Sequence, residues 1–309
     1  MSAATIRNRV LRSADDDWRV LLEQTFAPAT VERLLREPEL LAGRSCEATM
    51  LFADLRGFTA IAEGLPPETA FALLGDVMEL LSDAVLRHEG VVVDYYGDGL
   101  AAMWNAPLEQ PHHADLACGA GLAMLEEMPA IAATWTERIG LPLELSVGIH
   151  TGVVQVGNAG TRRRFKYGPR GSAMNIASRV QSASKQLDVP LVATAAVRQR
   201  LTGEFTTHRL CTARLPGLEQ PLELIAVQRA ADEQRVRDDI ERYAAALAAF
   251  ERGDLDAAER GLADLIARGA SPAARFLAAQ AAAVRGNQLG RRAGDTFRPG
   301  DGVVEILSK

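Results

Sequence analysis

The chain has 309 residues, of which 48% are hydrophobic and 24% charged, and its formal net charge is −6. This length and composition suffice for one large domain with an appendage or for two domains, and no basic patch indicates nucleic acid as a partner. The cysteines, Cys46, Cys118 and Cys211, have no metal-ligand spacing and suggest no disulfide framework. Because the sequence also lacks a signal-like apolar core and a membrane-spanning run, we expect a soluble cytoplasmic protein with no membrane partner.

Residues 1–45 show a helical pattern ahead of the first predicted strand. Apolar side chains recur there at helical spacing, at Trp18, Leu21, Leu22, Phe26, Val31, Leu34 and Leu35. We interpret this segment as a helix packed on the next domain, with a dimerising or signal-transmitting helix as the alternative.

Strands and helices alternate from residue 46 to residue 230. Apolar runs and alternation predict strands over 48–53, 91–93, 100–104, 143–150, 153–157, 191–193 and 222–227, and helical periodicity predicts helices over 67–88, 115–135 and 172–185. The order strand, helix, strand, strand, helix, strand is the split βαβ arrangement. We therefore expect an α+β fold, a ferredoxin-like βαββαβ domain with extra strands.

Residues 235–286 are rich in alanine, and breaks at 253–254 and 269–272 divide them into three helical segments. The pattern resembles a tetratricopeptide unit, which cannot bury its apolar face alone. We expect this small α-helical segment to pack on the preceding domain, on a second chain or on a protein partner. Residues 287–309 form a tail, in which 303–307 predict one more strand.

Two short stretches carry the chemistry: LFADLRGFT at 51–59 and DYYGDGL at 94–100. Each places one carboxylate, that of Asp54 or Asp98, where an apolar strand meets a glycine-containing turn. A single Asp in such a place is commonly a turn or cap residue. Two carboxylates brought together can hold two hard divalent cations, which can clamp the attacking and leaving oxygens of a phosphoryl transfer.

These stretches belong to a set of five in fixed order, the others being MWNAP at 103–107, VGIHTG at 147–152 and NIASR at 175–179. With them the chain resembles the class III nucleotidyl cyclases, the catalytic domains of adenylate and guanylate cyclases, over residues 46–228. The resemblance implies a catalytic domain at 46–230. It also implies an enzyme of signal transduction, a phosphorus–oxygen lyase that converts a nucleoside triphosphate into the 3′,5′-cyclic monophosphate and pyrophosphate.

The resemblance also assigns the metal and phosphate contacts. Asp54 and Asp98 match the two metal-binding aspartates of the family, and with the backbone carbonyl of Leu55 they would hold two divalent cations, Mg²⁺ or Mn²⁺. The loop that includes Phe58 and Thr59 would offer backbone N–H groups to the phosphates of the substrate.

Asn175 and Arg179 stand four residues apart on a predicted helix and so share one face of it. They match the residues that orient the ribose and stabilise charge on the α-phosphate in the family. There one protomer supplies the aspartates and the other supplies the Asn and Arg. Since this chain carries both sets, the resemblance implies a homodimer with two equivalent sites; a surface Asn and Arg on a helix are the alternative.

The base-selecting positions depart from the pattern of adenylate cyclases. Asp94 stands where those enzymes have Lys, and Gly168, after Tyr167, stands where they have Asp or Thr. Guanine offers donors at N1 and N2 and an acceptor at O6, so the Asp94 carboxylate suits guanine, with Arg170 as the candidate donor to O6. We therefore favour GTP as the substrate, with ATP and the pyrimidine nucleotides UTP or CTP as alternatives.

Other readings of these positions stay open. Asp94 could pair with Arg162, Arg163, Arg164 or Lys166 and never contact a base. The family's phosphate-binding Lys near the last strands has no counterpart around 214–217, where Arg214 is the nearest substitute. A function of another class is also open: a catalytically silent cyclase fold that acts as a nucleotide sensor or protein-interaction module.

Overall fold

The structure, a computed structural model, describes residues 19–20, 22–161, 164–203, 205–230, 234–269, 271–289 and 302–306. The strands are β1 (Arg44–Leu55), β2 (Val91–Tyr96), β3 (Gly99–Trp104), β4 (Leu145–Thr161), β5 (Arg164–Arg170), β6 (Leu191–Thr194), β7 (Phe205–Arg214), β8 (Leu222–Arg229) and β9 (Val303–Glu305). The helices are α2 (Pro28–Arg36), α3 (Phe58–Glu63), α4 (Pro67–Arg87), α5 (His113–Ile139), α6 (Ser172–Leu187), α7 (Ala195–Arg198), α8 (Gln234–Glu251), α9 (Leu255–Ala267) and α10 (Pro272–Leu289), with a 3₁₀ turn, η1, at Pro38–Leu41.

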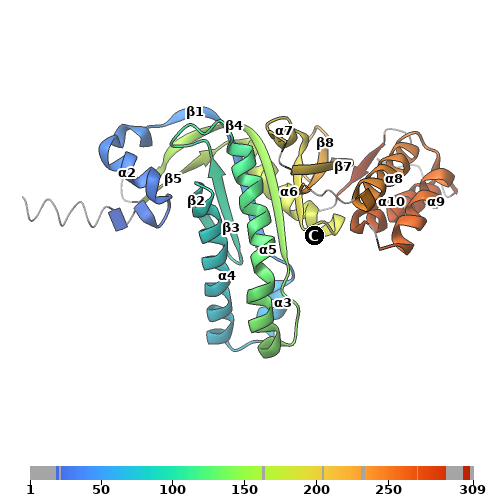
Figure 1. Cartoon of the computed structure of the whole chain (residues 1–309), viewed down its shortest axis with the longest axis horizontal. Coiled ribbons are helices and arrows are strands. Elements are labelled where there is room, and N and C mark those ends of the chain that lie inside the picture. The colour runs from blue at the N-terminus through green and yellow to red at the C-terminus, as the bar shows by residue number, and fades with distance from the viewer. Residues whose placement is uncertain are drawn as a thin grey trace, which may run out of the picture.

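The strands form one mixed sheet in the order β2-β3-β1-β4-β6-β8-β7-β9, with β5 paired to the far part of β4. The first four strands in this order are antiparallel neighbours. Helix α4 joins β1 to β2, and α5 joins β3 to β4. This is the ferredoxin-like arrangement, so the predicted α+β core is confirmed. Figure 1 shows α4 and α5 side by side along the sheet, with α2 at one end of the molecule and α8–α10 at the other.

Strand β1 sends alternate side chains into two different cores. Leu51, Ala53 and Leu55 pack with the buried side chains of α4 and α5. Met50 packs on the opposite face, in a cluster that includes Ala177 of α6. Because successive side chains of a strand point to opposite faces, the side chain of residue 54 lies on the α6 face.

The N-terminal segment packs on the sheet, as predicted. Phe26 of this segment forms a bridge with Val91, and its ring lies 5.5 Å from that of Tyr167. Val31 and Leu34 of α2 are buried in the same cluster. The predicted apolar positions Trp18 and Leu21 lie outside the described residues.

The predicted strands need one correction and one addition, and the C-terminal strand is confirmed. The separate strands predicted at 143–150 and 153–157 are wrong, because β4 continues through Thr151 and Gly152, which stay paired with Thr49 and Ala48. Strands β5 and β7 were not predicted. The predicted C-terminal strand is confirmed as β9, which runs parallel to β7.

The three predicted C-terminal helices are confirmed as α8, α9 and α10, and their apolar face is covered by the same chain. Tyr243, Leu247 and Phe250 of α8 lie in one buried cluster with side chains of β7, β8 and α6. The Tyr243 hydroxyl donates a hydrogen bond to the carbonyl of Leu210 in β7 (2.8 Å). The division of the chain at 45, 230 and 286 stays a prediction.

Helix α5 alone, among the described helices, has the length and hydropathy of a membrane span. Half of its most apolar stretch is buried inside the fold. Since it packs against β1, β3, β4 and α4, the structure accounts for its hydropathy as that of a core helix.

Candidate active site

The predicted carboxylates are brought together at the end of β1. Asp54 is paired in register with Gly99 of β3, the residue after Asp98. The N–H of Leu55 donates to the carbonyl of Asp98 (3.4 Å). A Cβ at Gly99 would lie 3.3 Å from Oδ2 of Asp54, so glycine at this position leaves room for the carboxylate.

The two carboxylates influence each other electrostatically. The pKa of Asp98 is raised above its ordinary value, first by burial and then by the negative charge of Asp54. The ammonium group of Lys185 on α6 forms an ion pair with Oδ1 of Asp54. The two carboxylates thus lie close enough for the charge of Asp54 to act on Asp98, and one ammonium group lies against Asp54.

The donor set fits a hard divalent cation that arrives with a phosphate ligand. Asp54, Asp98 and the Leu55 carbonyl are all oxygen donors at one strand end. Within the described residues, no group of three or more His, Cys, Asp or Glu side chains gathers elsewhere as a closed metal cage. Mg²⁺ is commonly held by one or two carboxylates while substrate phosphates and water complete its coordination.

The loop after Asp54 turns sharply into α3. Gly57 has a φ of +68°, which favours glycine, and α3 begins at Phe58. Phe58 is half-buried against the α4–α5 core, and Thr59 is exposed. The N–H of Arg56 already donates to the carbonyl of Glu144 (2.8 Å). The phosphate donors expected here are therefore the first amides of α3, which have no partner within the helix.

Asn175 and Arg179 lie on α6 but not at the aspartates of their own chain. Asn175 is exposed, and the guanidinium of Arg179 lies beside Gly217, where a Cβ would be 3.1 Å from it. Lys185, which does contact Asp54, lies about 120° around the helix from Arg179. Among the described residues, no hydrogen bond or ion pair joins Asn175 or Arg179 to the aspartates.

The residues predicted to select the base lie on β2 and β5, which contact each other. Oδ1 of Asp94 forms an ion pair with Lys166 and accepts a hydrogen bond from the N–H of Tyr95 (2.9 Å). Lys166, Gly168 and Arg170 alternate along β5 and so share one face of it. A Cβ at Gly168 would lie 3.1 Å from Val93.

Of the pairings considered for Asp94, the structure therefore shows the one with Lys166. Arg162 and Arg163 lie outside the described residues, as does the side chain of Arg164.

Arg214, the nearest substitute for a phosphate-binding lysine, is engaged elsewhere. Its Nε donates to Glu305 of β9 (3.1 Å), and its Nη1 donates to the carbonyl of Glu219 (2.8 Å). These contacts tie Arg214 to the C-terminal strand.

Sequence reasoning missed three residues that support Asp54. Gln181 donates to the hydroxyl of Ser146 (2.6 Å), which donates to the backbone carbonyl of Asp54 (3.2 Å). Lys185 follows Gln181 by one helical turn and reaches the carboxylate itself. The sequence shows that Gln181 and Lys185 are four residues apart on one helix. It does not show which strand this face of α6 covers.

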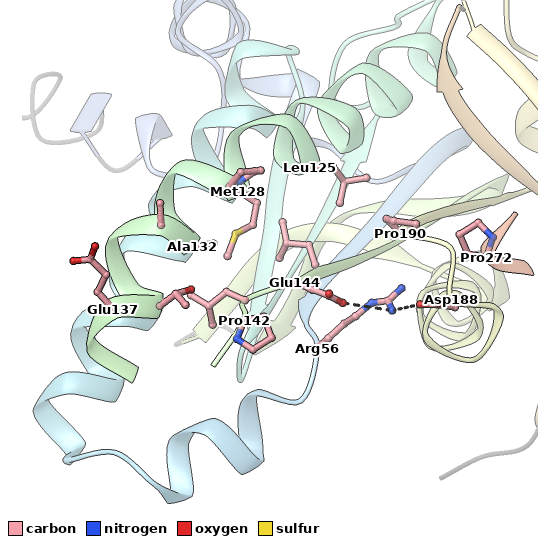
Figure 2. Close-up of a pocket in the computed structure, with 15 residues that line it drawn as sticks. Arg56, Leu125, Met128, Ala132, Glu137, Pro142, Glu144, Asp188, Pro190 and Pro272 are labelled. Atoms are coloured by element: carbon pink, nitrogen blue, oxygen red, sulfur yellow. Dashed lines mark hydrogen bonds and ion pairs between the residues drawn. The ribbon is translucent and has the colours of Figure 1, made fainter. Parts of the chain in front are cut away.

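A separate cavity of about 850 Å³ lies beside α5. Leu125, Met128 and Pro142 form part of its apolar wall, and Figure 2 shows Arg56 at its edge, paired with Glu144 and Asp188. Neither Asp54 nor Asp98 lines this cavity, so it is not the site assembled above.

The chain is similar to known proteins of one family. The family model of the adenylate and guanylate cyclase catalytic domain matches residues 41–225. The chain is 34% identical over 210 residues to adenylate cyclase 1 of Rhizobium meliloti, covering 66% of this chain and 31% of that protein. It is 30% identical over 239 residues to an adenylate cyclase of Mycobacterium tuberculosis, covering 75% and 52%. The chain thus spans about a third to a half of the length of these curated relatives.

Two solved structures are similar to the chain. The adenylyl cyclase CyaB from P. aeruginosa is 26% identical with a TM-score of 0.57, covering 62% of this chain and 98% of that one. A guanylyl cyclase is 27% identical with a TM-score of 0.55, covering 62% and 96%. Relatives named for either base are therefore similar to this chain.

Proposed function

Because the chain belongs to the family of class III adenylate and guanylate cyclases, we propose that two copies of it convert a nucleoside triphosphate into the 3′,5′-cyclic monophosphate and pyrophosphate. In this reaction the ribose O3′ forms a bond to the α-phosphorus, the bond to the β-phosphate oxygen breaks, and the 3′-hydroxyl proton leaves. The observation that carries the proposal is the meeting of Asp54 and Asp98 at the end of β1.

Asp54, Asp98 and the Leu55 carbonyl would hold two Mg²⁺ or Mn²⁺ ions, which when bound would help deprotonate the 3′-hydroxyl and offset charge at the α-phosphate. The chain's own part is to fix these oxygens at a strand end. The first amides of α3, at Phe58 and Thr59, would orient the phosphates.

Asn175 and Arg179 would act on the substrate held by the partner's aspartates. Asn175 would orient the ribose, and Arg179 would stabilise charge developing on the α-phosphate. Among the described residues, Lys185 is the α6 side chain that pairs with Asp54, and neither Asn175 nor Arg179 forms a hydrogen bond or ion pair with it, which supports this assignment. A homodimer with two equivalent sites is part of the proposal, and cytoplasmic location stays a prediction.

For the base we propose GTP, because the Asp94 carboxylate could accept hydrogen bonds from the guanine donors, and Arg170 shares a face of β5 with Lys166, the residue that contacts Asp94. A second candidate, ATP, is favoured by a specific contact: Lys166 pairs with Asp94, and its ammonium group could donate to adenine if these two residues line the base site. The curated relatives described above are named adenylate cyclases, which supports the second candidate. Cyclisation of UTP or CTP is the remaining alternative.

The test is product identification with ATP, GTP, CTP and UTP offered in parallel to the purified chain under Mn²⁺. We expect one cyclic nucleotide to dominate, with pyrophosphate released in equal amount. Turnover of none of the four would favour the silent sensor or interaction module instead.

A further inference from the structure

Lys185 places a positive charge directly on one of the proposed metal ligands. Its ammonium group pairs with Oδ1 of Asp54, and both side chains are partly buried, 32% and 26% exposed respectively. The two residues are 131 positions apart in sequence, so the contact depends on how α6 packs on the sheet.

The packing of α6 on β4 fixes the position of Lys185. A Cβ at Gly148 in β4 would lie 2.0 Å from the backbone nitrogen of Gln181, so glycine allows α6 to lie directly on the strand. The Gln181 amide then bonds Ser146, whose hydroxyl bonds the carbonyl of Asp54. Lys185 follows Gln181 by one helical turn, and its ammonium group reaches the carboxylate of Asp54.

An ammonium group and a divalent cation compete for the same carboxylate oxygen. A cation that binds Asp54 must break the Lys185 ion pair or share the oxygen with it, and it then lies near a positive charge. Both effects oppose metal binding. In return, the ion pair restrains the Asp54 side chain when no metal is bound.

We propose that Lys185 is the resident counter-ion of the metal-free site, a positioning residue that occupies Asp54 until a divalent cation displaces it. The inference rests on the proposed metal role of Asp54 and Asp98. It assigns Lys185 a function in setting the metal affinity of the site, a function separate from contact with the substrate.

The test is Mn²⁺ binding to the purified full chain without nucleotide, followed by electron paramagnetic resonance of the free ion. Removing one positive charge about 6 Å from a dication, even at the dielectric constant of water, corresponds to a change on the order of tenfold. Lys185→Met should therefore bind Mn²⁺ on the order of tenfold more tightly than the wild type.

Two matched variants control for charge and for folding. Lys185→Arg keeps the positive charge and should bind Mn²⁺ as the wild type does. Arg252→Met removes the positive charge of an exposed arginine directly after α8, outside the proposed site, and should leave Mn²⁺ affinity unchanged. Circular dichroism of each variant establishes that the fold is retained.

The outcomes separate this inference from the function on which it rests. If the wild type binds Mn²⁺ through Asp54 but Lys185→Met binds it equally or more weakly, the counter-ion role is wrong and the metal site stands. If Asp54→Asn does not weaken Mn²⁺ binding in the wild-type background, Asp54 is not a metal ligand, and the counter-ion role of Lys185 is then also wrong.

Discussion

Asp54 and Asp98 stand at neighbouring strand ends, yet their surroundings differ. Asp54 lies on the α6 face of the sheet with the Lys185 ammonium against it. Asp98 lies in the turn between β2 and β3, where burial and the Asp54 charge raise its pKa. The Asp54 carboxylate is therefore paired with an ammonium group. A bound cation would lower the raised pKa of Asp98.

Asp54→Asn and Asp98→Asn should each abolish cyclic nucleotide formation. Metal charge stabilisation is worth several kcal/mol, so we expect a loss of at least about a hundredfold in kcat. Asp83→Asn, an exposed change on α4, is the matched control and should retain full activity. Residual turnover within tenfold of the wild type in either site variant would remove the two-metal assignment.

The raised pKa of Asp98 predicts a pH dependence of metal binding. A proton and a metal ion compete for this carboxylate, so Mn²⁺ affinity should fall as the pH drops through its pKa, above the value of about 3.9 for a free Asp. Mn²⁺ titrations across a pH series measure the midpoint of this fall. A midpoint at or below that of a free Asp would show that Asp98 is not the titrating ligand.

The same shift has a consequence for stability. A raised pKa means that the folded state holds a proton more readily than the unfolded state, so stability is lost as the pH rises through the folded pKa. At neutral pH, Asp98→Asn should therefore raise the Tm, and at pH near 3 the gain should vanish. A lower Tm at neutral pH would contradict the stated electrostatics.

The Asp94–Lys166 pair predicts opposite effects of two substitutions on base preference. If Asp94 reads guanine, Asp94→Asn should lower kcat/KM for GTP relative to ATP by about tenfold or more, since one good base contact is worth about 1–3 kcal/mol. If Lys166 reads adenine, Lys166→Met should lower kcat/KM for ATP instead. An unchanged ranking of the four triphosphates in both variants would show that neither Asp94 nor Lys166 selects the base.

Among the helices and strands, the sequence predicted those whose own residues show a regular apolar pattern. The ferredoxin-like core was predictable because its strands and helices are apolar on their buried faces. Strand β5 was hidden by Gly168 and Pro169, and β7 by its polar start at Thr206 and Thr207. Strand β5 pairs with the preceding strand β4, and β7 pairs with β8 and β9, and the pattern of one segment alone does not show such pairing.

The residues of the candidate site also differ in how far the sequence predicted them. Asp54 and Asp98 were predictable, because each stands at a recognisable strand end. Lys185 and the Asp94–Lys166 pair were not, because these contacts join residues 131 and 72 positions apart. Sequence reasoning named Lys166 as one possible partner of Asp94 among several, and only the packing of β2 against β5 selects it.

The C-terminal helices share a core with the cyclase sheet rather than forming a free appendage. Leu247 of α8 is 2% exposed and lies in a cluster with side chains of β7 and β8. A chain of ion pairs also runs from Arg275 of α10 through Asp188 to Arg56, each contact at 3.0 Å, ending in the loop that follows Asp54.

Leu247→Ala should lower the free energy of unfolding of the cyclase core by about 2–5 kcal/mol, because it leaves a cavity in this shared cluster. Urea unfolding followed by tryptophan fluorescence measures it, since Trp104 and Trp135 lie in the core under α4 and α5. A variant whose tryptophan transition is unmoved would show that the helices unfold independently.

Across the whole molecule, no hydrogen bond or ion pair in the described part of the chain joins the two aspartates to Asn175 or Arg179. The aspartates face Lys185 of the same chain, whereas Asn175 and Arg179 occupy another face of α6. In the homodimer that we propose, each pair of aspartates would act together with the Asn and Arg of the partner copy. Each active site would therefore be formed by two copies of the chain.

Mixing two inactive variants, Asp54→Asn and Arg179→Ala, tests this claim most directly. In a heterodimer one site carries both defects and the other carries neither, and random pairing makes half of the dimers mixed. Cyclic nucleotide formation should therefore recover to about a quarter of the wild-type rate. A mixture that exchanges subunits, forms dimers and stays as inactive as either variant alone would contradict the shared site.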